Sequence, residues 1–117
     1  MLEHTRMATI TAAAFIGLSL CVGAKAQSVT LGQFQHPKSA KDLEINRIYL
    51  VGAAEALIAY NASAEQKLFC LPGLVPKLTF DEASDLVLHW ARKTSGSVDL
   101  SLARALLFGL RAAHPCR

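Results

Sequence analysis

Apolar residues recur at helical spacing over most of the chain beyond position 40. Between positions 40 and 62 they stand three or four residues apart, which predicts one long helix. Gly52 lies inside this helix. Because an interior glycine costs about 1 kcal/mol relative to alanine, we expect a close helix contact or a kink there. The stripe expected to be buried comprises Leu43, Ile48, Val51, Leu57 and Ile58.

A second helix is predicted from the segment that begins "TFDE". Thr79 followed three residues later by Glu82 is the pattern of a capping box, and we expect the helix to end by Thr94. Trp90 is interpreted as a core anchor rather than as a binding hot spot, because it falls on the apolar side. That side comprises Phe80, Ala83, Val87, Trp90 and Ala91.

A third helix is predicted from near Asp99 to about Ala113, where Pro115 stops it. Arg104 and Arg111 fall on its exposed side. Its buried stripe is expected to comprise Leu102, Ala105, Leu106, Gly109, Leu110 and Ala113.

Between the first two helices, the stretch "KLFCLPGLVPKL" is apolar but interrupted by prolines, which favours an extended connector. We expect it to be held by Cys70 and by packing of Leu68, Phe69, Leu71 and Leu74. Apolar and polar residues do not alternate over a long enough run to indicate a β-strand. The pattern therefore predicts an all-α fold, a small three- to four-helix bundle, the count depending on whether Gly52 or the N-terminal arm breaks off another helix.

The first 26 residues have the layout of a secretory signal peptide. Arg6 precedes an apolar run too short to cross a bilayer, and Ala24 and Ala26 form the small-x-small pattern of signal peptidase. A retained membrane anchor and a lipoprotein signal ending at Cys21 are less consistent alternatives, and translation could also start at Met7. We expect cleavage before about Gln27, which places the mature protein in the periplasm. Residues 27–39 are then a polar, loosely attached arm, and 40–117 the helical domain.

Cleavage of this leader would remove Cys21 and leave Cys70 and Cys116 in an oxidising compartment. We therefore expect one disulfide between them. A pair of free thiols and a metal site remain alternatives, although no CxxC spacing is present. The leader carries two basic residues and one acidic residue, so the mature chain keeps 10 of 12 Lys and Arg and 8 of 9 Asp and Glu, a formal charge of +2. This balance, without a basic stripe, argues against a nucleic-acid partner.

No catalytic motif occurs in the mature chain, and we predict that the protein is not an enzyme and has no cofactor or metal. The most site-like group is Glu82, Asp85, His89 and Arg92, which share one helix face. A carboxylate beside a histidine can act as a general base, but a solvated helix face is the favoured interpretation. The polar loop from Arg92 to Asp99 is a second candidate surface.

Three stretches together resemble the Rap/Tai family of periplasmic immunity proteins of type VI secretion. They are "IYLVGAAEAL", "FCLPGLVPKLTFDEASDLVLHWARK" and "LARALLFGLRAAHPC", which cover roughly residues 45 to 116. Cys70 and Cys116 match the family's cysteine pair, whereas a further pair that many members have in the N-terminal half is missing. The segment before the last helix is also short.

The resemblance implies a secreted helical protein that binds a peptidoglycan amidase effector and covers its active site. Such an inhibitor needs a contact surface, and a homodimer is a further possible assembly. After signal cleavage, no membrane contact is expected. An alternative from another class is a periplasmic acid-stress chaperone, since the small helical build and single disulfide would suit both. The residues expected to contact a protein partner are Arg92, Lys93, Ser95, Ser97, Asp99, Asp85 and His89.

Overall fold

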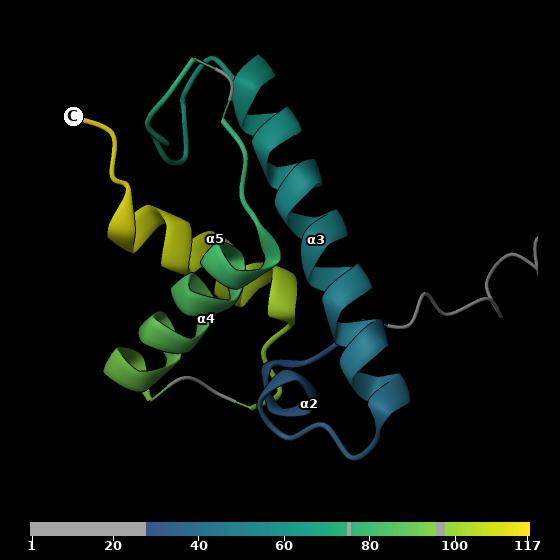
Figure 1. The fold of residues 1–117 in the computed structure, drawn as a ribbon. Coiled ribbons are helices and arrows are strands. Elements are labelled where there is room, and N and C mark those ends of the chain that lie inside the picture. The colour runs from purple at the N-terminus through teal and green to yellow at the C-terminus, as the bar shows by residue number, and fades with distance from the viewer. Residues whose placement is uncertain (1–27, 75, 96–97) are drawn as a thin grey trace, which may run out of the picture.

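The computed structural model describes residues 28–74, 76–95 and 98–117, and in these ranges the chain is all-α. The predicted signal peptide lies outside the described residues. An isolated antiparallel bridge joins Thr30 to Ser101, and no longer strand pairing occurs in the described part. Helices α3, α4 and α5 match the three predicted helices, and α2 is added before them (Figure 1). Their bounds are α2 Leu31–Gln35, α3 Ala40–Ser63, α4 Phe80–Thr94 and α5 Leu102–Ala113.

Helices α4 and α5 form a tightly packed hairpin that contributes most of the core. Gly109 of α5 lies against the backbone of α4, and a Cβ added there would stand 2.7 Å from the carbonyl oxygen of Leu86. Only glycine permits this approach without displacing a helix. On the outer side of the contact, the rings of Trp90 and Phe108 lie 5.3 Å apart, and Trp90 is half-buried against the core. The buried stripes of both helices agree with the prediction, except that Ala113 is exposed.

Helices α4 and α5 each begin at a residue whose side chain accepts a hydrogen bond from a free backbone N–H group of the first turn. The predicted capping box is present, since the Thr79 hydroxyl accepts from the N–H of Glu82 at 3.2 Å and the Glu82 carboxylate accepts from the N–H of Thr79. Helix α5 starts three residues later than expected, because Ser101 rather than Asp99 caps it through the N–H of Arg104.

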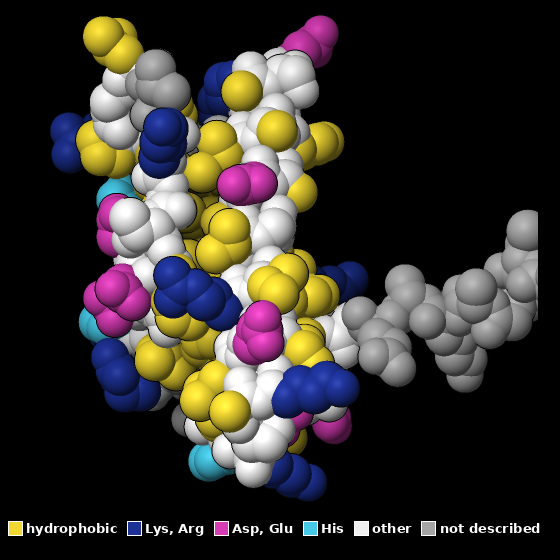
Figure 2. All heavy atoms as spheres, turned by 45° about the vertical axis from the view of Figure 1, so that its right-hand side comes forward, with side chains coloured by type: hydrophobic (Ala, Val, Ile, Leu, Met, Phe, Trp, Pro, Cys, Tyr) yellow, Lys and Arg dark blue, Asp and Glu magenta, His cyan; other side chains and the backbone are white. Residues whose placement is uncertain are grey.

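Helix α3 buries only part of the predicted stripe: Leu57 and Ile58 are half-buried and pack against the core, as expected. It turns Leu50, Ala54 and the polar Asn46 and Asn61 toward the rest of the molecule. Leu43 and Ile48 were expected to be buried, but they are 57% and 65% exposed. The prediction failed for these two residues because α3 has apolar residues on every side, so spacing alone did not select a face. Figure 2 shows apolar side chains along the exposed surface of this part of the molecule.

Gly52 has neither of the expected roles, because α3 runs unbroken through it. No atom of another element lies within 4 Å of the position that a Cβ would take there. The close helix contact occurs instead at Gly109.

The segment predicted to be a loosely attached arm is docked on the start of α5. Val29 and Leu31 are buried, and the backbone N–H of Leu31 donates to the carbonyl of Leu100 at 2.8 Å. Two further backbone bonds, from Gly32 to Val98 and from Leu102 to Val29, complete this attachment. The prediction weighed the polar composition of the segment and overlooked its apolar residues, which cover the end of the core.

The two glycines provide a matched test of the packing. Replacing Gly109 with Ala forces the backbones of α4 and α5 apart, and we expect it to lower the free energy of unfolding by about 1 to 3 kcal/mol. The same change at exposed Gly52 meets no atom and should raise it by about 0.5 to 1 kcal/mol, because alanine is the better helix former. Urea denaturation followed by circular dichroism at low protein concentration measures both. Equal midpoints for Gly109→Ala and the wild type would contradict the packing described here.

Candidate partner-binding surface

The connector between α3 and α4 is held at its start and exposed in its middle. Phe69 is 1% exposed, and Leu68 and Leu71 pack against the core as predicted. Leu74 was expected to pack with them but projects fully into solvent. Gly73, directly before it, has φ = 101°, a left-handed conformation that glycine adopts readily. The turn at Gly73 therefore directs the chain away from the core.

The predicted disulfide between Cys70 and Cys116 is present, with an S–S distance of 2.01 Å and Cα atoms 5.0 Å apart. The backbone N–H of Cys70 also donates to the carbonyl of His114 at 2.8 Å. A covalent bond and a hydrogen bond thus join the connector to the chain that follows α5.

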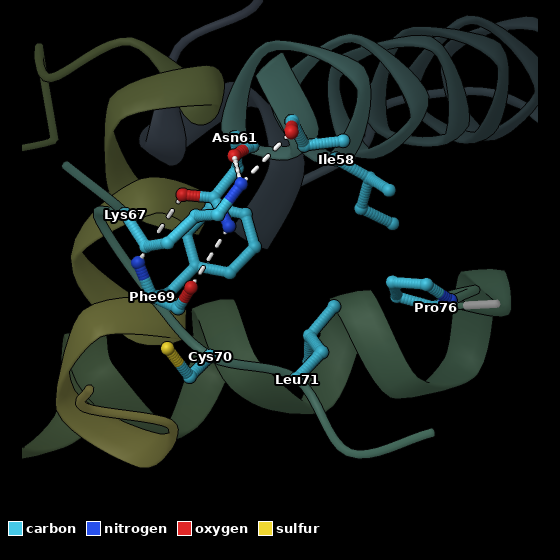
Figure 3. Close-up of a pocket in the computed structure, with 8 residues that line it drawn as sticks. Ile58, Asn61, Lys67, Phe69, Cys70, Leu71 and Pro76 are labelled. Atoms are coloured by element: carbon cyan, nitrogen blue, oxygen red, sulfur yellow. Dashed lines mark hydrogen bonds between the residues drawn. The ribbon is translucent and has the colours of Figure 1, made fainter. Parts of the chain in front are cut away.

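Asn61, in the last turn of α3, holds the same connector from the other side (Figure 3). Its amide oxygen accepts from the N–H of Leu68 at 2.7 Å, and its amide nitrogen donates to the carbonyl of Phe69 at 2.8 Å. Lys67 turns back onto the helix end and donates to the carbonyls of Asn61 and Ala62. Helical spacing gave no indication of this role for Asn61, although a polar residue on the inner side of an apolar helix could have suggested it.

These contacts border a shallow pocket of about 200 Å³ beside the disulfide (Figure 3). The polar side chains that line it, Asn61 and Lys67, already bind the connector and the helix end. The pocket therefore offers apolar contact and no free acid–base pair. Its lining comprises Ile58, Asn61, Ala62, Lys67, Phe69, Cys70, Leu71 and Pro76.

The polar face of α4 borders a larger open groove of about 470 Å³. Asp85, His89 and Arg92, which the sequence placed on one helix face, all line it. His114 joins them from the end of α5, a contribution that spacing along α4 could not reveal. The groove therefore combines acidic, basic and imidazole side chains with two leucines. Its full lining is Leu78, Glu82, Asp85, Leu86, His89, Arg92 and His114.

The predicted loop after α4 is only partly a free projection. Lys93 and Ser95 are exposed, and Ser95 leaves the helix in a left-handed conformation with φ = 50°. Ser97 lies outside the described residues. Asp99 is exposed but engaged in an interaction, and the neighbouring carbonyl of Val98 accepts from Gly32 of α2. The beginning of the loop thus continues the α4 surface, whereas its end is fixed to α2.

The described residues contain no group of three or more His, Cys, Asp or Glu side chains arranged to hold a metal ion. Every buried side-chain nitrogen or oxygen in this part of the chain has a hydrogen-bond partner. None of the helices described here is both long enough and apolar enough to cross a membrane.

The fold and its surfaces define a small helical protein closed by one disulfide, with an open groove along α4. A family model for Rap1a immunity proteins matches residues 17–116, which is most of the chain. The chain belongs to the Rap1a immunity protein family. Comparisons with curated proteins and with solved structures give no match.

The contribution of the disulfide to stability can be measured with serine variants of its two cysteines. Cys116→Ser should lower the free energy of unfolding by about 2 to 5 kcal/mol, because the unfolded chain regains the freedom that the bond removes. Cys70→Ser should cost the same, and the double variant should cost no more than either, since all three lose one bond. Thermal and urea unfolding provide the measurement. A clearly additive loss in the double variant would show that the two sulfurs act separately.

Proposed function

We propose that the protein is a periplasmic immunity protein that binds a peptidoglycan amidase delivered by type VI secretion and blocks its active site. The observation that carries this proposal is the family match over residues 17–116. Family membership indicates an immunity function toward a protein effector, and the amidase and the secretion route are the finer parts of the proposal. The leader predicted at residues 1–26 supports action in the periplasm, where peptidoglycan is attacked.

The contact surface that we propose, called the α4 surface below, combines the exposed face of α4 with the loop that follows it. It comprises Asp85, His89, Arg92, Lys93, Ser95, Ser97 and Asp99. Two observations support it: Arg92 lines the groove and lies in the last turn of α4, next to exposed Lys93, and the groove residues Asp85, His89 and Arg92 share their lining with apolar Leu78 and Leu86. Apolar floors with polar rims are typical of protein interfaces.

The acid-stress chaperone has no comparable support. An acid switch needs carboxylates whose protonation loosens the fold, and buried ones would have the largest effect. In the described part of the chain, the buried polar side chains are Asn46 and Asn61, which do not titrate. The immunity function is therefore the one that we propose.

The first test is protection of cells. Where a peptidoglycan amidase is encoded beside this protein, its expression in the periplasm should lyse cells, and co-expression of the full chain should prevent lysis. A variant lacking residues 1–26 should fail to protect, although the same purified protein should inhibit peptidoglycan cleavage in vitro. Amino-terminal sequencing of the exported protein should begin at or near Gln27. Lysis despite accumulation of the exported, folded protein would contradict inhibition of that amidase.

The second test concerns the contact surface. Replacing Arg92 and Lys93 with Glu should weaken binding to the amidase about 10- to 100-fold, as loss of central interface contacts does. The free energy of unfolding should change by about 0.5 kcal/mol or less, because both side chains are exposed. The control variant reverses two exposed charges elsewhere, Arg104 and Arg117, and should bind as the wild type does. Equal loss of affinity in the two variants would mean that net charge matters and the α4 surface does not.

A further inference from the structure

The middle of the connector between α3 and α4, residues 72–74, displays a leucine that has no contact with the core. We call this segment the connector tip. Leu74 is fully exposed, at 103%, more than any other large apolar side chain in the described residues. A single exposed leucine is unremarkable on its own. This one, however, follows Gly73 in its left-handed conformation and Pro72, whose backbone is restricted, so the local sequence turns it outward.

The chain is held on both sides of the connector tip. Before it, Phe69 is buried and Cys70 is bonded to Cys116. After it, Leu78 packs against the core and Thr79 caps α4. A short segment that is fixed at both ends has less conformational freedom to lose on binding, so more of the contact energy is retained as affinity.

A hollow lies directly beside the tip. It is the shallow pocket of about 200 Å³ next to the disulfide, and Figure 3 shows Ile58 of α3 facing Leu71 and Pro76 of the connector across it. A dry cavity of about 150 Å³ can hold a benzene molecule, so this pocket has room for one apolar side chain. The connector thus presents an apolar projection and an apolar hollow next to each other.

The α4 surface needs a neighbouring contact to form a stable complex. Helix α4 has 15 residues and is about 22 Å long, so a contact about 10 Å wide on it covers roughly 220 Å². Stable complexes bury about 800 Å² per partner. The connector adjoins the α4 groove, because Pro76 lines the pocket and Leu78, two residues later, lines the groove. The N–H of Cys70 also binds the carbonyl of His114, another groove residue.

We propose that the partner bound at the α4 surface also binds the connector tip: Leu74 enters an apolar pocket of the partner, and an apolar side chain of the partner enters the pocket beside the disulfide. This inference rests on the immunity function proposed above. The rim of the partner's pocket carries carboxylates, since Lys67 and Lys77 flank the tip and no acidic residue lies between positions 67 and 78.

The first test measures affinity for the amidase from which the chain protects cells, using calorimetry on the mature protein. Leu74→Ala should weaken binding about 10-fold, because the buried apolar area is lost. Leu74→Asp should weaken it about 100-fold or more, since a carboxylate would enter an apolar pocket with an acidic rim. Both variants should melt within about 2 °C of the wild type, because the side chain is exposed.

The matched control is Leu43→Asp, which places the same charge on an exposed leucine at the other end of α3. It should bind the amidase as the wild type does. Unchanged binding by Leu74→Asp, or an equal loss of binding by Leu43→Asp, would overturn the proposal. A change in the sedimentation of the free protein in Leu74→Asp would identify a second copy as the occupant and would also overturn it.

The second test examines the pocket without a partner. Isobutanol, which has the branched shape of a leucine side chain, should shift the amide NMR signals of Ile58 and Leu71 at millimolar concentration. Ala62→Leu fills the pocket from the end of α3, keeps a strong helix former there, and should abolish these shifts and weaken amidase binding. Absence of the shifts in the wild type would refute the role of the pocket. Failure of the wild type to bind the amidase would instead refute the immunity function, and the isobutanol result stands apart from it.

Discussion

The bond between Cys70 and Cys116 encloses the whole α4–α5 hairpin in one covalent loop. The connector has no regular secondary structure to fix it, so its position depends on this bond, on the amide of Asn61 and on the burial of Phe69. The same attachment holds His114 beside α4, where it completes the polar groove. A loop of this length limits the unfolded chain more strongly than a local cross-link would. The packing of the hairpin and the shape of the groove on its surface therefore both depend on this disulfide.

The parts of the fold that follow from local rules could be predicted. Thr79 and Glu82 determine the start of α4, and a one-sided apolar stripe orients α5. Helix α3 could not be oriented in this way, because apolar residues on all its sides satisfy several burial patterns at once. The choice between Gly52 and Gly109 as the tight contact depends on which helix lies opposite, and this information is absent from the local sequence.

The candidate site was predictable to the same extent. Asp85, His89 and Arg92 share a face because α4 is regular, so helical spacing was sufficient to group them. His114 reaches the groove only through the chain beyond α5, and Asn61 acts on a connector that helical periodicity does not describe. Residues within one helix can thus be placed together from sequence, whereas residues joined by tertiary contacts cannot.

The bridge between Thr30 and Ser101 joins segments that are far apart in the chain. Contacts of such high sequence separation require a long loop to close before they contribute, and they slow folding. The last helix also emerges last during synthesis, so the segment around Leu31 has no partner until nearly the whole chain has been made. Burial of this N-terminal segment is consequently a late folding event, and until then its apolar side chains remain available to chaperones and proteases.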